Sequence, residues 1–589
     1  MDELTLPYNT IVEALLGVEE CTEFGARFIP KSGDPVFFSY KEVISRAKSA
    51  AGTLQAKGII PGDRVAIILS TSIHFLDAFL GVQLAGGIPS ALYPPFRLGR
   101  LDEYYESTSK MLTKIGARFL VTDGRIGRLL GPVVEGTECV EGVLNPKDLQ
   151  STARWTPVAV DPESPAFLQF SSGATREPKA VIVSHTNLLY NLEMMNTVFS
   201  TLSPEEWNKE AVCWLPLYHD MGLVGCVFNS LYFPCTMSYI EPDIFLARPA
   251  IWLQTISRFR AAFSPAPQFA YNLCTNKIKD EDMAGVDLSD WISAMNGAEP
   301  IDTQGMGRFL ERFARWGFRE STMMPVYGLA EATLAVTFSD IHLPPVVSEF
   351  DRSKLSEEGH AKEAAGRDIA SVGSLLPGLE LRICDEQDNP RKDGLIGKIM
   401  VKGPSITPGY YNDPEITKAT IRNGWLDTGD LGFIHDRNLY ISGRTKDLII
   451  IRGRNIDPQE IEELLNDMEG IRKGCVAAVS TPIHGQGEQL IMLAERDIRQ
   501  PHPEEKLAKE IKERVIAGVS VAPYHIQILE PGTLPRTSSG KKRRSEALRM
   551  FLSGELVPPE KMGVFKLLHK IGKSQVAWGR YFLKKRDSK

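Results

Sequence analysis

The chain has 589 residues, of which 43% are hydrophobic and 24% charged, and its formal net charge is −7 at pH 7. This length exceeds what one hydrophobic core usually supports, so we expect two or more domains. The composition is that of a soluble globular protein, and the charge gives no indication of nucleic-acid binding.

The N-terminal residues, MDELTLPYNT, contain neither a basic leader nor an apolar core, so we expect no signal peptide. The eight cysteines are scattered and form no CxxC pair, which favours reduced thiols over a disulfide framework or a zinc site. The longest apolar stretch, residues 65–90, is interrupted by polar residues and does not resemble a membrane helix. These features together predict a cytoplasmic protein.

Strands and helices alternate through the first 330 residues. Residues 64–69 (RVAIIL) predict a buried strand, Ser70 is placed to cap an apolar helix over 71–85, and residues 116–124 predict another strand. The same alternation recurs at 210–275 and 290–330. This order predicts an α/β fold with a largely parallel sheet.

The stretch LQFSSGATREPKAVIVSH (168–185) places hydroxyls, a glycine and a lysine between two segments that predict strands. A helix with one apolar stripe is expected next. That stripe consists of Leu188, Leu192, Met195 and Phe199. The strand–loop–strand order excludes a Walker P-loop, which runs from a strand into a helix and carries GxxxxGK[ST]. The loop can still bind phosphate, although a polar surface hairpin is the alternative. The groups available are the backbone near Gly173, the hydroxyls of Ser171, Ser172 and Thr175, and the ammonium of Lys179.

Beyond residue 375 the pattern changes to short strands joined by turns. Residues 448–465 predict a strand, a turn and a helix, with Asp457 at the N-cap, Pro458 at the first helical position and Glu460 at the capping-box position. Strands at 475–480, 488–494 and 525–529 and a helix at 503–517 complete a small α/β unit. We predict an N-terminal domain over 1–443, a mobile C-terminal domain over 444–549 and a basic amphipathic tail over 550–589.

Six motifs follow the loop in order: WLPLYHDMGLVG (214–225), NGAEPI (296–301), YGLAEATLAV (327–336), WLDTGDLGFI (425–434), GRTKDLIIIRGRNIDPQEIE (443–462) and LPRTSSGKKRR (534–544). With them the chain resembles the adenylate-forming enzymes over roughly residues 10–549. This superfamily includes acyl-CoA synthetases, luciferases and peptide-synthetase adenylation domains. The resemblance implies a large α/β domain with a β-rich lobe, a small mobile domain, and attack of a carboxylate on the α-phosphate of ATP in the presence of Mg²⁺, giving acyl-AMP and pyrophosphate.

The resemblance also implies roles for the nucleotide-binding residues. Ser171, Ser172, Gly173, Thr175 and Lys179 would hold the phosphates, and Glu331 would be the magnesium ligand; a helix-start acid is the alternative for Glu331. The adenine site would be lined by Gly297, Ala298, Glu299 and Gly328, with Tyr327 stacking on the base. Asp430 would accept hydrogen bonds from both ribose hydroxyls, assisted by Arg444.

Three residues would serve the reaction itself. Lys541 would reach the α-phosphate and the acyl carboxylate; a solvated lysine in the basic run 541–544 is the alternative. His219 would border the entry of the acyl carboxylate, unless it is a buried, hydrogen-bonded histidine. Lys446 occupies the hinge position about which the small domain would swing between two half-reactions.

The strings HDMGL, NGAEP, LAVTFSD and IIIRGRN together resemble fatty acyl-AMP ligases, which load a fatty acid onto the phosphopantetheine of an acyl-carrier protein instead of coenzyme A. Residues 340–368 lie where that branch carries an insertion that disfavours the coenzyme A reaction; an ordinary surface loop is the alternative. Two other functions stay open: an acyl-CoA synthetase, and an adenylate-binding protein with weakened catalysis.

Two segments depart from the family or lie outside its motifs. In the loop, Ala174 replaces a usual hydroxyl residue, and Arg176 and Ala180 replace usual glycines, which brings rate and nucleotide affinity into question. The tail mixes basic with apolar side chains, and three interpretations are open: an interfacial membrane helix, a docking site for an acidic carrier protein, or packing on the chain's own catalytic domain, which we favour.

Overall fold

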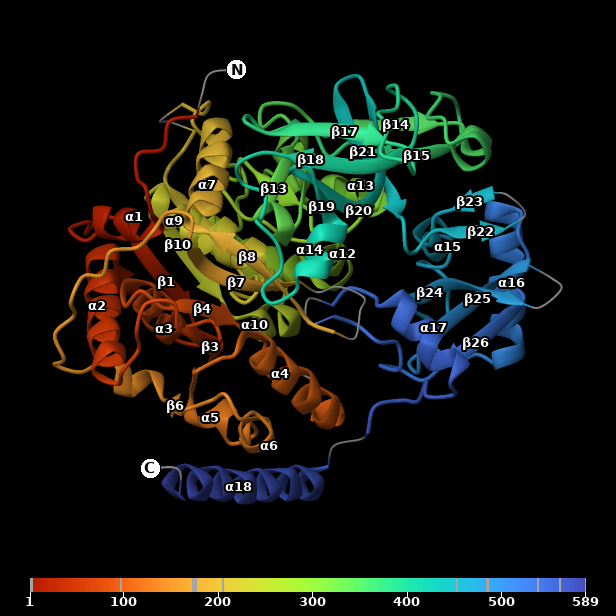
Figure 1. Cartoon of the computed structure of the whole chain (residues 1–589). Helices are drawn as coiled ribbons and strands as arrows, with labels where there is room; N and C mark the ends of the chain where they lie inside the picture. The colour runs from red at the N-terminus through yellow and green to blue at the C-terminus, as the bar shows by residue number, and fades with distance from the viewer. Residues whose placement is uncertain are drawn as a thin grey trace.

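The computed structural model describes residues 4–95, 98–171, 177–203, 206–451, 454–483, 487–537, 540–560 and 563–587. Figure 1 shows a large α/β body formed by the first three quarters of the chain, a smaller unit beside it, and a last helix along the outer edge of the body. The α/β class expected from the sequence is confirmed.

Two four-stranded sheets form the first part of the body. One has the order β4–β3–β5–β6 and is parallel throughout; its strands are β3 (Arg64–Ile68), β4 (Ile88–Ala91), β5 (Phe119–Thr122) and β6 (Gly142–Leu144). The other has the order β2–β1–β10–β9, with β2 the antiparallel edge; its strands are β1 (Gly25–Ile29), β2 (Val36–Ser39), β9 (Glu210–Cys213) and β10 (Thr236–Ile240). Burial on both faces explains the nearly continuous apolar sequences of β3, β4 and β5.

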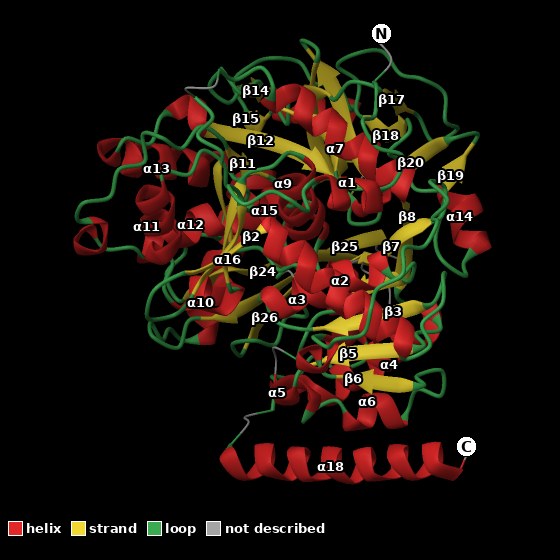
Figure 2. Ribbon diagram, turned by 90° about the vertical axis from the view of Figure 1, so that its left-hand side faces the viewer, coloured by secondary structure: helices red, strands yellow, loops and turns green. Residues whose placement is uncertain are grey.

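The helices of the body cover these sheets, as Figure 2 shows. Helix α3 (Ile73–Leu84) packs on α2 (Tyr40–Ala56). The expected cap Ser70 is wrong: α3 begins later, and its N-cap is Ser72. The other body helices are α1 (Ile11–Gly17), α4 (Leu101–Ile115), α5 (Gly124–Gly127), α6 (Gly131–Glu135), α7 (His185–Phe199), α8 (Asp220–Gly222), α9 (Asn229–Tyr232), α10 (Pro242–Ala247), α11 (Ala250–Phe259), α12 (Gln268–Lys277) and α13 (Thr303–Phe313).

The polar loop predicted within residues 168–185 joins β7 (Pro165–Ser171) to β8 (Lys179–Ser184), and the two strands pair antiparallel. The strand–loop–strand order is therefore confirmed, and α7 buries the expected apolar stripe. Ala180 lies fully buried in β8 opposite Phe170, in extended backbone that needs no glycine.

A third sheet and a β-rich lobe complete the body. The third sheet has the order β11–β12–β13–β16, with strands β11 (Ala294–Asn296), β12 (Met323–Gly328), β13 (Ala335–Phe338) and β16 (Ser374–Leu375). The lobe consists of β17 (Glu380–Cys384), β18 (Gly397–Lys402), β19 (Ile421–Arg422), β20 (Trp425–His435) and β21 (Asn438–Arg444), with α14 (Pro414–Thr420) beside it. A ribbon of β14 (Val347–Phe350) and β15 (Arg367–Ala370) lies in and next to the segment 340–368.

The smaller unit contains the elements expected after residue 447, which are β22 (Ile449–Ile451), α15 (Pro458–Glu463), β24 (Ile471–Ile483), β25 (Gly487–Arg496), α16 (Glu504–Val519) and β26 (His525–Leu529). It also contains β23 (Arg454–Ile456) and α17 (Arg544–Leu552), which were not expected. Asp457 caps α15 by accepting from the Gln459 amide, and Pro458 is its first residue. The capping-box expectation for Glu460 is not met, because its carboxylate instead pairs with Arg352, 3.2 Å away.

Helix α18 (Val564–Asp587) ends the described chain and packs on α6, along the edge of the parallel sheet (Figures 1 and 2). Among the described residues, no helix is long and apolar enough to cross a membrane.

Candidate active site

The β7–β8 hairpin brings Ser171 and Lys179 opposite each other at the mouth of the loop. Ser172, Gly173, Ala174, Thr175 and Arg176 lie outside the described residues. The Lys179 ammonium lies 5.2 Å from the centre of the Tyr410 ring. Burial lowers the pKa of Lys179, and the neighbouring charge of Lys446 lowers it further. An anionic ligand would relieve this cost by neutralising the two lysines.

Glu331 shares this corner of the site. Its Oε1 accepts a hydrogen bond of 2.9 Å from the Tyr410 hydroxyl. Burial raises the pKa of Glu331, and the nearby carboxylate of Asp220 raises it further, whereas Lys179 acts in the opposite direction. A buried carboxylate that burial destabilises in its charged form is a suitable ligand for a hard cation, since Mg²⁺ prefers carboxylate oxygen and completes its shell with phosphates and water. The donor set therefore fits the expected metal.

Asp430 is the centre of a second group, on β20. Its Oδ2 accepts a hydrogen bond of 2.7 Å from the Tyr327 hydroxyl, and its Oδ1 lies 3.0 Å from Nε of Arg444. The Asp430 carboxylate is almost fully buried, so the loss of either partner would leave a buried charge without a hydrogen bond and would cost free energy. Each carboxylate oxygen can accept a second hydrogen bond, so capacity for a vicinal diol remains. The Tyr327 ring, expected to stack on adenine, is thus held in orientation by its own hydroxyl.

The segment after β11 turns sharply beside β12. A Cβ on Gly297 would lie 2.7 Å from Cγ2 of Val326, and one on Gly328 would lie 1.8 Å from the Leu334 carbonyl oxygen, so both positions require glycine. Ala298 has a φ of 68°, a left-handed conformation that costs a non-glycine residue energy. Ala298, Tyr327 and Gly328 line the cavity, and their role in binding adenine stays a prediction. Oε1 of Glu299 accepts a hydrogen bond of 2.5 Å from the Phe269 amide, which is part of the same fold.

Lys541 belongs to the small unit and lines the same cavity as Asp430. Burial lowers the pKa of its ammonium, and nearby Arg444 lowers it further. Three carboxylates act in the opposite direction: Asp220, Glu299 and Asp430. The backbone around it is fixed locally, because the Lys541 amide donates to Oγ1 of Thr537 at 3.0 Å. The place of Lys541 in that cavity supports the predicted role over a solvated lysine in the basic run.

Two other residues of the basic run, Lys542 and Arg544, anchor the lysine loop to helix α15. Nζ of Lys542 pairs with Glu462 and donates to the Val476 carbonyl at 3.0 Å. Nε of Arg544 lies 2.7 Å from Oε1 of Glu462, and its Nη1 lies 3.0 Å from Asp447. Burial opposes the charge on Glu462, but Lys542 and Arg544 outweigh it and bring its pKa to about 2. Thus, within the basic run 541–544, Lys541 lines the cavity while Lys542 and Arg544 hold the loop to α15.

His219 and Asp220 lie at the start of α8. Nδ1 of His219 is 2.6 Å from Oδ1 of Asp220, and the same oxygen accepts from the Met221 amide at 2.7 Å. Burial would raise the pKa of Asp220, yet His219 and Lys541 keep it below its usual value. The sequence predicted His219 as a site residue. It did not predict its immediate neighbour Asp220, nor Tyr410. Neither carries a distinctive sequence signal, since their roles come from partners distant in the chain.

One cavity of about 3010 Å³ connects these groups. Its polar lining includes Lys179, His219, Tyr327, Glu331, Asp430, Arg444, Lys446 and Lys541. An apolar part of the lining comes from Met195, Phe199, Trp207, Met237, Phe263, Leu334 and Phe338. The cations expected to bind the phosphates and the apolar side chains therefore line the same cavity.

Comparison with known proteins identifies the family. The profile of the AMP-binding enzymes matches residues 20–411. This chain belongs to the AMP-binding enzymes. Long-chain-fatty-acid–AMP ligase FadD23 of Mycobacterium tuberculosis is 32% identical over 544 residues, covering 88% of this chain and 91% of that protein. A solved structure from work on fatty acyl-adenylate ligases of E. coli and L. pneumophila has a TM-score of 0.86 at 33% identity, covering 93% of this chain and 98% of its own.

A further structure, the fatty acyl-adenylate ligase of L. pneumophila in complex with acyl adenylate and pyrophosphate, is 29% identical with a TM-score of 0.70, covering 93% of this chain and 98% of its own. The resemblance predicted from the motifs is thus confirmed, and this AMP-binding enzyme is an adenylate-forming ligase. The individual residue roles, the domain division and its hinge remain predictions, because the comparisons assign no residues.

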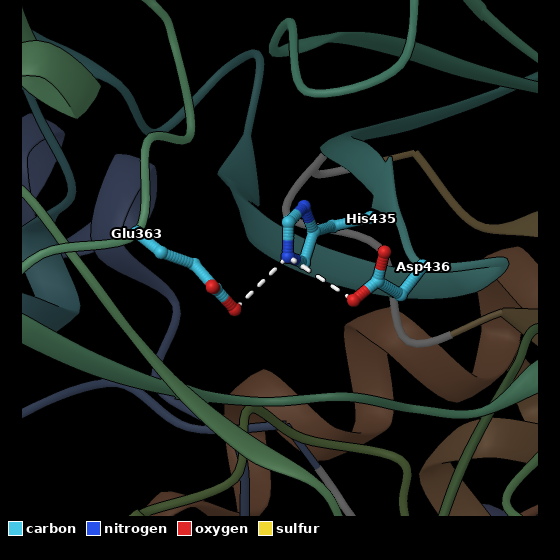
Figure 3. Close-up of side chains that lie close together, drawn as sticks. All are labelled: Glu363, His435 and Asp436. Atoms are coloured by element: carbon cyan, nitrogen blue, oxygen red, sulfur yellow. Dashed lines mark hydrogen bonds and ion pairs between the residues drawn. The ribbon is translucent and has the colours of Figure 1, made fainter.

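In this AMP-binding enzyme the segment 340–368 contacts both the β-rich lobe and the small unit. Phe350 packs on Phe433 and Tyr440 of the lobe, with ring centres 5.1 and 5.4 Å apart. Nε2 of His435 lies 3.0 Å from Glu363 of the segment and 3.6 Å from the adjacent Asp436, as Figure 3 shows. These contacts fix the segment on the lobe.

On its other side the same segment carries two arginines that pair with α15 and its cap. Nη2 of Arg367 lies 2.9 Å from Asp457, and Nε of Arg352 lies 3.2 Å from Glu460. Arg352 also donates to the Gly518 carbonyl at 2.5 Å. Because the other side of the segment packs on the lobe, these ion pairs connect the lobe to the small unit.

Proposed function

We propose that this enzyme converts a fatty acid and ATP to fatty acyl-AMP and pyrophosphate, and then transfers the acyl group to the phosphopantetheine thiol of a separate acyl-carrier protein. In the first step a fatty-acid carboxylate oxygen bonds to the α-phosphorus while the bond from that phosphorus to the bridging oxygen of pyrophosphate breaks. In the second step the thiol takes the acyl group, and AMP leaves. Adenylation is the function that the cavity and the relatives support together.

The observation that carries the proposal is that Lys541 lines the same cavity as Asp220, Glu299 and Asp430. Bringing a carboxylate to a triphosphate requires cations, and a buried ammonium stabilises developing charge more strongly than a solvated one. Lys179 lies opposite Ser171 at the loop expected to hold the β- and γ-phosphates. Asp430 and Tyr327 would orient the ribose and the base, so that the α-phosphate is presented in line to the attacking oxygen.

Glu331 is proposed to hold the magnesium ion, with its carboxylate oriented by the Tyr410 hydroxyl. The ion would neutralise phosphate charge. Binding a cation would also remove the penalty that burial places on the charged form of Glu331.

The apolar part of the cavity supports an acyl substrate. Aromatic and aliphatic side chains at Phe199, Trp207 and Phe338 line it, together with Met195 and Met237. Such a lining favours an alkyl chain over a charged or polar amino-acid side chain. The names of the relatives agree with this substrate class.

The contacts of residues 340–368 support a carrier protein as the acceptor instead of coenzyme A. The ion pairs of Arg352 and Arg367 with the small unit stabilise the adenylating arrangement relative to any other orientation of that unit. If coenzyme A transfer needs a large rotation of the small unit, these pairs raise its cost, whereas a tethered phosphopantetheine reaches the site from outside.

The test uses the full chain with ATP, Mg²⁺ and medium- to long-chain fatty acids, with and without coenzyme A, and follows pyrophosphate and acyl-AMP. Acyl-AMP that accumulates in the presence of coenzyme A supports the proposal. Efficient acyl-CoA formation would assign the chain to the acyl-CoA synthetases. Nucleotide binding without pyrophosphate release for any acid would instead indicate weakened catalysis, consistent with the altered loop residues Ala174 and Arg176.

A further inference from the structure

The last helix, α18, is fixed to the body by one face. Ser574, Ala577 and Tyr581 are buried, and their spacing of three and four residues places them on one stripe. Oγ of Ser574 accepts from the Gly131 amide at 2.9 Å, and Nε1 of Trp578 donates to the Gly127 carbonyl at 2.9 Å. The favoured expectation that the tail packs on its own catalytic domain is therefore met for this face.

The opposite face of α18 carries apolar side chains exposed to solvent. Phe565, Val576 and Leu583 are 89%, 55% and 54% exposed. They are separated by eleven and seven residues, close to three and two helical turns, so they form one line about 27 Å long. Leu568 and Phe582 widen it on one side and are also mostly exposed. An apolar line of this extent on a monomer surface usually marks an interaction site.

The charge along this helix is mostly positive. Helix α18 contains five lysines, two arginines and one carboxylate residue, the last residue Asp587. Several of these cations have partners; among the described residues Lys566 pairs with Glu560, Lys570 with Asp102, and Arg580 with Glu135. Beside Gly127, where Trp578 is held, the exposed residues Arg125 and Arg128 add further positive charge. The outer side of α18 is thus apolar along its centre and basic at its flank.

We propose that the outer face of α18 docks on an anionic membrane surface. In both views the helix lies straight along the outermost edge of the molecule, so a flat surface can contact its whole length without meeting the rest of the body (Figures 1 and 2). A convex apolar ridge with basic flanks matches the headgroup region of a bilayer, where apolar side chains enter the acyl boundary and lysines meet anionic lipid. An acidic protein would match the charge but needs a groove for the ridge.

Docking of α18 on a membrane is independent of adenylation, because vesicle sedimentation measures binding of the chain and not its activity. The full chain is sedimented with vesicles of phosphatidylcholine alone and of equal parts phosphatidylcholine and phosphatidylglycerol. We expect partition onto the anionic vesicles to be about tenfold stronger or more, and to weaken as salt is raised. Equal partition onto both vesicles, or none onto the anionic ones, would overturn the proposal.

The variant Phe565→Ser, Val576→Ser, Leu583→Ser tests the face directly. All three side chains point to solvent, so the thermal unfolding temperature should stay unchanged while partition falls about tenfold or more. A matched triple, Leu343→Ser, Ile450→Ser, Ile498→Ser, removes similarly exposed apolar side chains elsewhere and should bind as the parent does. Loss in both triples, or in neither, would refute the assignment to α18. So would retention of an acidic carrier protein by the parent in the absence of vesicle binding.

Discussion

Glu462 is the residue through which the small unit positions Lys541, and its replacement by glutamine gives a quantitative test. The carboxylate is 2% exposed and bonds to Lys542, Arg544 and the Ala478 amide. Its pKa is about 2, against an ordinary value of 4.5. A difference of about 2.5 units corresponds to about 3 kcal/mol of folding free energy, which agrees with the about 3–5 kcal/mol lost when a buried ion pair loses one partner.

The sign of the pH dependence follows from a lowered carboxyl pKa. The stabilisation is complete above the unfolded-state pKa of about 4.5 and is lost as the pH falls toward 2. At pH 7.5 we therefore expect Glu462→Gln to lower the unfolding temperature of the small unit by about 10 °C. We also expect pyrophosphate release to fall about tenfold or more, because Lys542 and Arg544 no longer hold the adjacent Lys541 in place.

The neighbouring Glu463 provides a matched control. Burial raises its pKa to about 7, so at pH 6 its side chain is mainly protonated, and glutamine is a close substitute. A raised carboxyl pKa costs stability as the pH rises from 4.5 through 7, so Glu463→Gln should be nearly neutral at pH 4.5 and increasingly stabilising as the pH rises to 8, opposite in sign to Glu462→Gln. If Glu462→Gln unfolds at the parent temperature and keeps full activity at pH 7.5, the anchoring argument is refuted.

Three further outcomes are expected. Lys541→Ala should reduce adenylation by about a hundredfold or more with ATP binding largely retained, since its charge acts at the reacting phosphate; unchanged pyrophosphate release would reject the assignment. Tyr327→Phe removes one hydrogen bond to buried Asp430 and should weaken nucleotide binding about tenfold by calorimetry, whereas equal affinity would show that the carboxylate needs only Arg444. The double variant Arg352→Ala, Arg367→Ala frees the small unit and should increase acyl-CoA formation with adenylation retained; coenzyme A use as low as in the parent would separate the insertion from acceptor choice.

The sequence determined the strand–loop–strand order around Ser171 and Lys179, because apolar runs and a polar loop are local properties of the chain. It also determined the family, since the motifs occur in a fixed order. Local signals failed at Ser70 and Glu460. Both residues have the chemistry of a helix cap, but α3 begins later than expected, and Arg352 from a distant segment takes the carboxylate of Glu460.

Only the tertiary structure decided the chemistry of the site. The motifs assigned Lys541, Glu299 and Asp430 to one site by resemblance, but nothing in the residue order shows that Asp220 lines the same cavity or that Tyr410 donates to Glu331. The same holds for the tail, whose mixed basic and apolar sequence allowed three interpretations until the fold buried one face. The physical reason is that charge interactions, desolvation and burial depend on distances through space, and these are set by packing between segments far apart in the chain.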